Sequence, residues 1–176
     1  LNNTEQILLL KKGDLDVTFT RQNLNSDEIE SLFVLREPLI FILPENHPLA
    51  KYERIPVKAL HGVDFIIPAA EQSLTLHNTI LEFAKTHGIE FNIVQKADNI
   101  LFNINSIGMG LGCTILPGYV APLTMKNTVI RALDVELPYL DLYVSYHKNS
   151  SSSAVHKFVE LLTHVFYLNI NRDSAI

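Results

Sequence analysis

Hydroxyl and guanidinium side chains stand at the ends of several elements that the sequence predicts. A helix is expected to begin at Thr4, a short strand leads directly into Arg21, and a buried strand is followed by Ser73-Leu74-Thr75 at the start of another helix. A helix N-terminus offers free backbone amides to an anion, and an arginine can hold a carboxylate through two parallel hydrogen bonds. If these ends converge, they would bind a small carboxylate. Each also has a simpler explanation, since serine and threonine are common helix caps and a single arginine is usually solvated.

The stretch GMGLGCTILP, residues 108–117, places glycines at alternate positions, Gly108, Gly110 and Gly112. In a dinucleotide-binding loop such glycines follow a strand and precede a helix, whose N-terminus then faces the phosphate. Here the predicted order is helix, glycines, strand. The glycines would therefore lie at the negative end of the helix dipole, which repels an anion. We interpret them as helix C-cap and close-packing residues, and no nucleotide cofactor is expected.

Other catalytic and metal-binding patterns are missing from the sequence. The seven histidines form no HxxxH or HExxH motif, although His156 and His164 could share one helix face, so no metal is expected. There is no GxSxG nucleophile motif. Because Cys113 is the single cysteine, an internal disulfide and a cysteine-based zinc cluster are excluded. We interpret Cys113 as a small, buried apolar side chain. The chain is not expected to be an enzyme.

Composition argues against direct binding to nucleic acid or to a membrane. The 176 residues carry a net charge of −5, with 14 Lys+Arg against 19 Asp+Glu, and the longest basic run is Lys11-Lys12. A nucleic-acid-binding face is normally basic, because its affinity comes largely from neutralising phosphates. Apolar runs such as LIFIL, residues 39–43, are far shorter than the roughly 20 residues that span a bilayer. No secretory signal opens the chain.

Predicted helices and strands alternate along the chain, which favours an α/β fold with mainly parallel sheets. Pro38 cannot donate to a sheet ladder, so one strand is expected to end before it and another to begin after it. The predicted helices lie within 2–13, 55–62, 73–89, 98–110 and 153–168, and the predicted strands within 15–19, 32–50, 63–68, 91–97, 113–117, 128–133 and 140–148.

Four segments together resemble the effector-binding domain of LysR-type transcriptional regulators. They are GDLDVTFTR (13–21), REPLIFILPENHPLA (36–50), FIIPAAEQSLTLHNTI (65–80) and SIGMGLGCTILPGYV (106–120), and the resemblance covers nearly all of the chain. The stretch from Asn92 to Tyr119 is most similar to the branch that activates phenylpropionate and cinnamate catabolism.

The resemblance implies two Rossmann-like lobes joined by two crossover strands, as in type II periplasmic binding proteins. Lobe I would comprise residues 1–37 plus 145–176, and lobe II residues 38–144. An effector would bind in the interlobe cleft, with Thr4 and Ser73 on its carboxylate and Leu74, Ile100 and Phe102 around its apolar part. The effector-binding residues implied in this way are Thr4, Arg21, Arg36, Ser73, Leu74, Thr75, Ile100 and Phe102.

Family members begin with a helix-turn-helix domain, which this sequence lacks, and the resemblance implies that the first lobe is truncated at its N-terminus. Promoter DNA would be bound only through that absent domain. The partners expected are a small, aromatic carboxylate effector and further copies of the chain, in a cytoplasmic homodimer or homotetramer that controls transcription. An exported solute-binding protein of the same fold is the alternative function.

Overall fold

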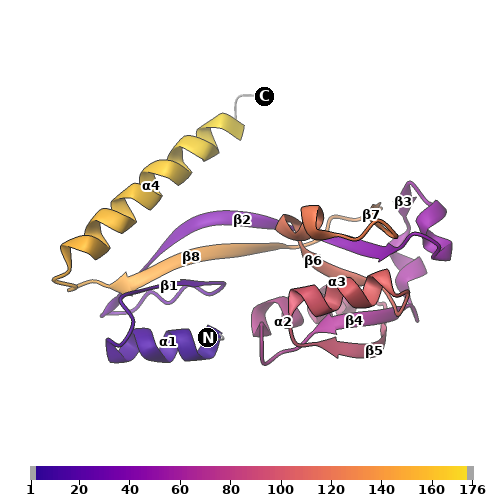
Figure 1. Ribbon diagram of the computed structural model, residues 1–176, viewed down its shortest axis with the longest axis horizontal. Helices are drawn as coiled ribbons and strands as arrows, with labels where there is room; N and C mark the ends of the chain where they lie inside the picture. The colour runs from indigo at the N-terminus through magenta and orange to yellow at the C-terminus, as the bar shows by residue number, and fades with distance from the viewer. Residues whose placement is uncertain (1–2, 174–176) are drawn as a thin grey trace. The chain divides into compact units, whose positions relative to one another are not determined.

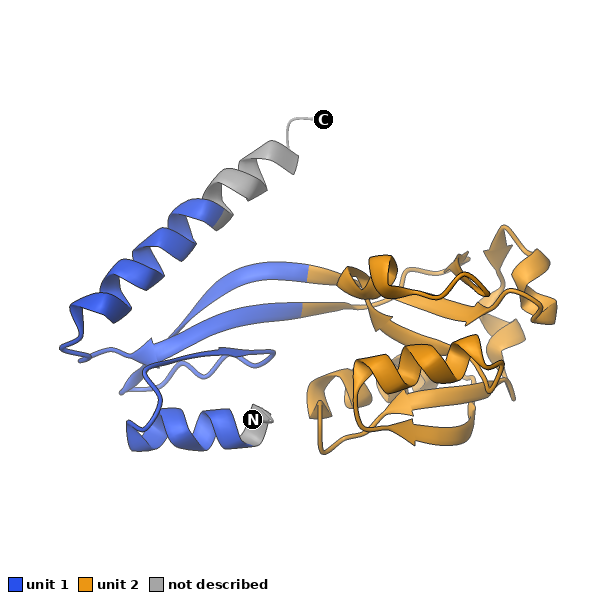
Figure 2. Ribbon diagram, in the orientation of Figure 1, with its two compact units in different colours: residues 1–36, 141–176 blue, residues 37–140 orange. Residues whose placement is uncertain are grey.

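The computed structural model describes the backbone of residues 3–173 and the side chains of residues 5–165. The chain divides into two compact units, coloured separately in Figure 2. Unit 1 consists of Leu1–Arg36 and Asp141–Ile176, and unit 2 consists of Glu37–Leu140. Two long strands, β2 (Ile29–Pro44) and β8 (Tyr139–His147), each belong partly to one unit and partly to the other. The chain therefore passes between the units twice, once along each strand.

Unit 1 combines helices with one end of the two long strands (Figure 1). Its strand β1 pairs antiparallel with β8, and β8 in turn neighbours β2. The apolar core of the unit joins Tyr146 of β8 to Val155 and Val159 of the last helix. In chain order the unit contains α1 (Asn3–Lys12), β1 (Val17–Thr20), the first part of β2, the last part of β8 and α4 (Ser153–Asp173).

The helix ends of unit 1 follow local signals in the sequence. Gly13 has φ of 77°, and its amide donates to the carbonyl of Leu10 at 3.0 Å, so it ends α1 as predicted. The hydroxyl of Ser152 accepts the amide of Val155 at 3.4 Å and caps α4. The expected cap at Thr4 is wrong, because α1 already includes Asn3. The predicted end of α4 at residue 168 is also too early, since the helix continues to Asp173.

Unit 2 contains strands of a larger mixed sheet, a separate pair of parallel strands and two α-helices (Figure 1). Strand β2 pairs antiparallel with β6 and β7, β7 pairs parallel with β3, and β4 pairs parallel with β5. A parallel bridge between Phe65 and Cys113 places the start of β6 beside β4. The elements are the second part of β2, η1 (Pro48–Lys51), β3 (Arg54–Ile55), η2 (Val57–Leu60), β4 (Asp64–Pro68), α2 (Leu74–Thr86), β5 (Asn92–Ala97), α3 (Ile100–Gly108), β6 (Thr114–Pro117), η3 (Gly118–Leu123), β7 (Thr128–Leu133) and the start of β8.

The core of unit 2 lies around β4, which is buried from Phe65 to Pro68. A continuous apolar run is typical of a strand that is covered on both faces. Helix α2 contributes Leu76, Ile80 and Phe83 at helical spacing, and α3 contributes its own buried isoleucines. These side chains belong to one cluster of buried residues, so β4 and the helices that follow β4 and β5 are fixed by a shared core.

Two sequence-based expectations about the sheet are wrong. Strand β2 continues through Pro38 without a break. The described β2–β6 ladder begins one residue later, at Leu39, so the missing amide of Pro38 interrupts none of its hydrogen bonds. The sheets are also not mainly parallel, because β1–β8, β2–β6 and β2–β7 are all antiparallel. The expectation failed because the alternation of helices and strands does not show whether the long strands β2 and β8 run parallel or antiparallel to their neighbours.

The interpretation of the glycine stretch is confirmed. Gly110, with φ of 79°, donates its amide to the carbonyl of Ile107 at 2.8 Å and ends α3. Gly112 packs against β4 so closely that a Cβ atom there would lie 2.8 Å from the carbonyl oxygen of Asp64. A Cβ at Gly108 would lie 2.5 Å from the sulfur of Met125. Gly110 therefore serves the helix end, Gly112 the tight packing of β6 on β4, and Gly108 the close approach of Met125 to α3.

Candidate functional site

The carboxyl ends of β4 and β5 form one edge of unit 2. The two strands are parallel, and Pro68 at the end of β4 is the register partner of Ala97 at the end of β5. The loop after β4 leads into α2, and the loop after β5 leads into α3. The N-termini of both helices therefore lie at the same edge, where their first-turn amides lack partners within the helix. Such an edge of a parallel sheet is the usual ligand-binding side.

Helix α2 begins at Ser73, which occupies the N-cap position without acting as a side-chain cap. Its amide donates to the carbonyl of Ala69 at 3.2 Å, but its hydroxyl bonds to none of the described groups. The carbonyl oxygen of Pro68 accepts a hydrogen bond from Nδ1 of His77 at 2.8 Å, which ties the first turn of α2 to the end of β4. The hydroxyl of Thr75, in the same turn, likewise has no partner among the described residues. Two hydroxyls thus accompany the free amides of this turn.

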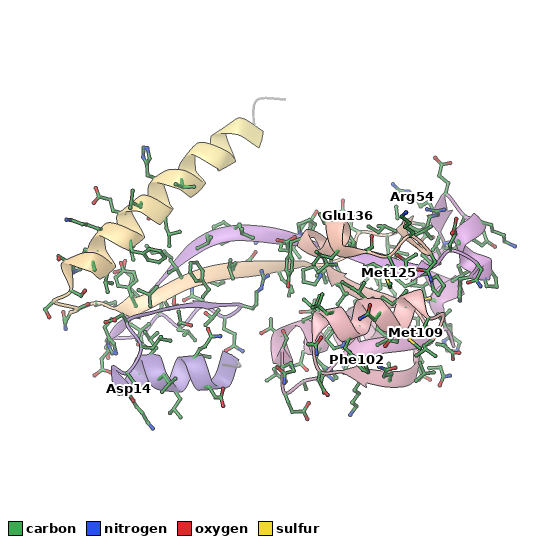
Figure 3. The ribbon with its side chains drawn as sticks, viewed as in Figure 1. Asp14, Arg54, Phe102, Met109, Met125 and Glu136 are labelled. Carbon is green, nitrogen blue, oxygen red and sulfur yellow. The ribbon has the colours of Figure 1, made fainter. Side chains whose placement is uncertain are left out.

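Helix α3 begins at a fully formed cap. Oδ1 of Asn99 accepts the amide of Phe102 at 2.8 Å, as expected for an asparagine at this position. Ile100 is half-buried against the core of unit 2, whereas Phe102 is 49% exposed and projects from the first turn of the helix (Figure 3). Leu74 of α2 is 52% exposed. The edge therefore combines polar groups at the start of α2 with apolar side chains from both helices.

Residues after β6 also reach this edge, and the sequence interpretation missed them. Strand β6 starts beside β4 in the same direction, so its carboxyl end points the same way. The amide of Tyr119 donates to Oε1 of Glu37 at 2.9 Å, and Tyr119 is half-exposed. A Cβ on Gly118 would lie 3.1 Å from the carbonyl oxygen of Pro38. The sequence signal for these residues was Pro117-Gly118-Tyr119, which marks the end of β6.

Arg36, one of the predicted effector-binding residues, belongs to unit 1 and forms an ion pair there. Its Nε and Nη2 donate to the two carboxylate oxygens of Asp141 at 2.7 and 3.1 Å. The hydrogen bonds from Arg36 hold the pKa of Asp141 below its ordinary value, against a smaller opposing effect of desolvation. Because Asp141 already balances the guanidinium charge, Arg36 is poorly suited to bind a second carboxylate.

The remaining predicted residues also belong to unit 1. Arg21 directly follows β1 and is half-buried. Thr4 lies in the first turn of α1, and its side chain is outside the described residues. Thus Ser73, Leu74 and Thr75 come together with Ile100 and Phe102 at one edge of unit 2, while Thr4, Arg21 and Arg36 belong to the other unit.

A groove of about 590 Å³ lies at the opposite end of the β4–β5 pair. It is lined by Leu81 and Lys85 in the later turns of α2 and by Glu90, Phe91 and Ile93 at the start of β5. The amino ends of strands and the C-termini of helices meet there, so the local dipoles disfavour an anion. The carboxyl edge is the better site for a carboxylate.

The one thiol of the chain is not arranged for chemistry. Cys113 is fully buried, and burial, with a smaller effect of the Asp64 charge, raises its pKa to about 12. A thiol with this pKa is almost entirely protonated near neutral pH and is a poor nucleophile. Among residues 5–165, no three histidine, cysteine or acidic side chains gather to hold a metal ion. Within the described part of the chain, no helix has the length and apolar character needed to cross a bilayer.

Comparison with known families identifies the class to which the chain belongs. Residues 1–166 match the LysR substrate binding domain family, so the chain belongs to that family, as its motifs predicted. The Hca operon transcriptional activator HcaR of Escherichia coli (strain K12) is 33% identical over 162 residues, which cover 92% of this chain and 55% of HcaR. The chain spans about half the length of the curated relatives it matches.

Solved structures show the same fold. The effector binding domain of QuiR in complex with shikimate has a TM-score of 0.81 at 20% identity, over 95% of this chain and 79% of that chain. The BenM effector binding domain with its effector benzoate has a TM-score of 0.78 at 15% identity, over 96% of this chain and 77% of the BenM chain. The fold is therefore the mixed α/β fold of LysR effector-binding domains, which is similar to that of type II periplasmic binding proteins.

Proposed function

We propose that this chain is the effector-sensing domain of a LysR-type transcriptional regulator and that its effector is a small, aromatic carboxylate. The observation that carries the proposal is the shared edge of β4 and β5. There the N-termini of α2 and α3 lie together, and the hydroxyls of Ser73 and Thr75 make no hydrogen bond with other described groups. The relatives support a regulator rather than an exported solute-binding protein, since HcaR is a transcriptional activator.

The carboxylate would bind at the first turn of α2. Its oxygens would accept hydrogen bonds from the free amides of this turn and from the hydroxyl of Ser73, with Thr75 as a further donor. The positive end of the helix dipole favours the negative charge. Ser73 is suited to this role because its hydroxyl, unlike the Asn99 side chain, is not already used as a helix cap.

The apolar part of the effector would lie against Leu74, Ile100 and Phe102. Leu74 and Phe102 are each about half exposed, so covering them with a ring removes apolar surface from water, which favours binding. Benzoate in BenM and shikimate in QuiR are both cyclic carboxylates, which fits this combination of a polar helix end and apolar neighbours.

We further propose that units 1 and 2 are the two lobes of the sensor and that Thr4 and Arg21 complete the site from lobe I. An effector that binds one lobe arrangement more tightly shifts the population of conformations toward it. This shift would reach promoter DNA through a separate DNA-binding domain, in a cytoplasmic homo-oligomer, without catalysis. The acidic balance of the chain, with 19 Asp+Glu and 14 Lys+Arg, suits a segment that leaves DNA contact to another domain.

A reporter assay tests the regulatory part of the proposal. The gene that encodes this chain, with its upstream coding sequence, is expressed beside a reporter driven by the neighbouring promoter region. Reporter activity is expected to change when benzoate, phenylpropionate, cinnamate or shikimate is added, and Ser73→Ala should shift this response to acid concentrations about tenfold or more higher. An unresponsive reporter with every acid, in cells that contain the folded protein, would count against the proposal.

A further inference from the structure

Helix α3 contains a buried polar side chain whose hydrogen-bonding capacity is unused. Asn103 is only 1% exposed, and neither its Oδ1 nor its Nδ2 has a hydrogen-bond partner among the described residues. Burying an amide without partners is costly, and such groups are rare in folded proteins. The neighbouring polar side chains of this helix differ. Asn99 caps the helix, and the hydroxyl of Ser106 donates to the carbonyl of Phe102 at 2.9 Å and accepts from Gln95 at 3.2 Å.

The surroundings of Asn103 give it no structural reason to be polar. It lies on the buried face of α3 with Ile104 and Ile107, both of which belong to the apolar core of unit 2. A leucine has the same number and branching of heavy atoms, with larger methyl groups in place of the amide, and would occupy this place without an unsatisfied polar group. The amide therefore lowers the stability of the unit, and its presence is explained if it has a partner in the liganded protein.

The position of Asn103 relates it to the candidate site. Ile100 is three residues earlier, so the two side chains share one face of the helix, with Asn103 one turn further from the carboxyl edge. Phe102, the adjacent residue, is half-exposed. An apolar ring placed against Ile100 would lie about one helical turn from the amide along the same face of α3.

We propose that Asn103 is a specificity-determining residue, whose amide binds a hydroxyl or carbonyl group that the effector carries in addition to its carboxylate. This inference rests on the proposed function and adds a substrate class to it, namely ring carboxylates with a second hydrogen-bonding group. A site built around a buried amide discriminates against an analogue without that group, because the amide is then left unpaired. The unpartnered amide at the start of α3 and the free hydroxyls of α2 would bind the two polar ends of one molecule.

Calorimetric titration of the folded chain with matched acids tests the inference. The pairs are meta-hydroxybenzoate with benzoate, meta-hydroxyphenylpropionate with phenylpropionate, and shikimate with cyclohexenecarboxylate. The protein is expected to bind the hydroxylated member of at least one pair about tenfold more tightly, the scale of one hydrogen bond. Asn103→Leu should abolish this preference while raising the melting temperature by about 2–4 °C or more.

Two further variants make the outcome unambiguous. Asn105→Leu makes the same change on the exposed face of α3 and should preserve the preference. Asn103→Ala removes the amide without adding volume and should lose the preference even if leucine disturbs folding. A preference retained in both Asn103 variants overturns the inference, as does equal binding within every pair by the unaltered chain. Failure of the unaltered, folded chain to bind any of the acids overturns the proposed function as well.

Discussion

Pro68 and Ala97 are register partners at the last position of the parallel β4–β5 ladder. This relationship brings the starts of α2 and α3 to one edge, although Ser73 and Asn99 are 26 positions apart in the sequence. The two helix starts are not equivalent. The side chain of Asn99 is used within its own helix, whereas that of Ser73 remains available.

Ser73→Ala is expected to weaken effector binding with little change in stability, whereas Asn99→Ala is expected to lower stability. Ser73→Ala should change the free energy of unfolding by less than about 0.5 kcal/mol, because no cap hydrogen bond is lost. It should weaken carboxylate binding by about tenfold or more, the scale of a hydrogen bond to a charged group. Asn99→Ala should cost about 1 kcal/mol of stability through its lost cap. Urea unfolding measures the free energy of unfolding of each variant, and calorimetric titration measures its affinity for the carboxylate. A large loss of stability in Ser73→Ala would show that the hydroxyl has a structural role.

Arg21→Ala is expected to weaken binding of a carboxylate effector by roughly 1.5–3 kcal/mol, because a hydrogen bond to a charged group is lost. Calorimetric titration of the variant gives the change in affinity. Arg54→Ala, which removes an exposed arginine from β3 of unit 2, is the matched control for the loss of one positive charge. Equal affinities of the unaltered chain and Arg21→Ala would place Arg21 outside the site.

The ion pair between Arg36 and Asp141 predicts a pH-dependent contribution to stability. Folding lowers the pKa of Asp141 below its ordinary value of about 3.9, chiefly through hydrogen bonds from Arg36. The ionised carboxylate therefore stabilises the folded state above that value, and this stabilisation is lost as the pH falls through the lower pKa of the folded protein. Asp141→Asn should be less stable than the unaltered chain near neutral pH by a small amount, because the pair is at the surface. The difference should vanish in acid.

Chemical denaturation of both proteins at several pH values checks this expectation. Asp14→Asn, at an exposed carboxylate in unit 1, controls for the removal of one negative charge. The stability difference between Asp141→Asn and the unaltered chain could also stay constant down to the most acidic pH. That result would contradict the assignment of the difference to the Arg36–Asp141 ion pair.

Cys113 should resist alkylation in the folded protein. Its pKa of about 12 keeps the thiol almost entirely protonated at pH 8, and the side chain is fully buried. Mass spectrometry after treatment with iodoacetamide should show labelling only when denaturant is added. Rapid labelling without denaturant would mean that this part of unit 2 opens readily or that the thiol is exposed.

The glycines after α3 should differ in their tolerance of alanine. Gly110→Ala should cost about 1 kcal/mol, because φ of 79° is unfavourable for a residue with a Cβ although the surrounding space is open. Gly112→Ala should cost more, about 1–3 kcal/mol, because its Cβ would press on the backbone of Asp64 and separate β6 from β4. Thermal unfolding of the two variants gives their order. A smaller effect for Gly112→Ala than for Gly110→Ala would contradict the close packing of Gly112 against the backbone of Asp64.

The sequence predicted most elements because their local signals agree with the tertiary structure. Apolar spacing in α2, the cap at Asn99 and the positive φ at Gly13 and Gly110 are all properties of short segments. The expected strand break at Pro38 was wrong, because a proline interrupts a strand only where its missing amide would have to donate to a neighbouring strand. The neighbouring strand of β2 is distant in sequence, so this could not be judged from the sequence.

The candidate site was predictable only in part. The positions of Ser73 and Ile100 follow from the rule that ligands bind beyond the carboxyl ends of parallel strands, together with the family resemblance. The ion pair of Arg36 with Asp141 and the contact of Glu37 with the amide of Tyr119 join residues that are far apart in sequence. The buried amide of Asn103 could not be recognised either, because an asparagine within a helix gives no local sign that it is buried and unpaired.

The central claim is that the start of α2 binds a small carboxylate. Its most direct test is calorimetric titration of the folded chain with benzoate, phenylpropionate, cinnamate and shikimate, in parallel with Ser73→Ala. The account predicts saturable binding of at least one acid to the unaltered chain, and a loss of about tenfold or more in affinity in the variant. Absence of heat with every acid, or equal affinities of the two proteins, would contradict it.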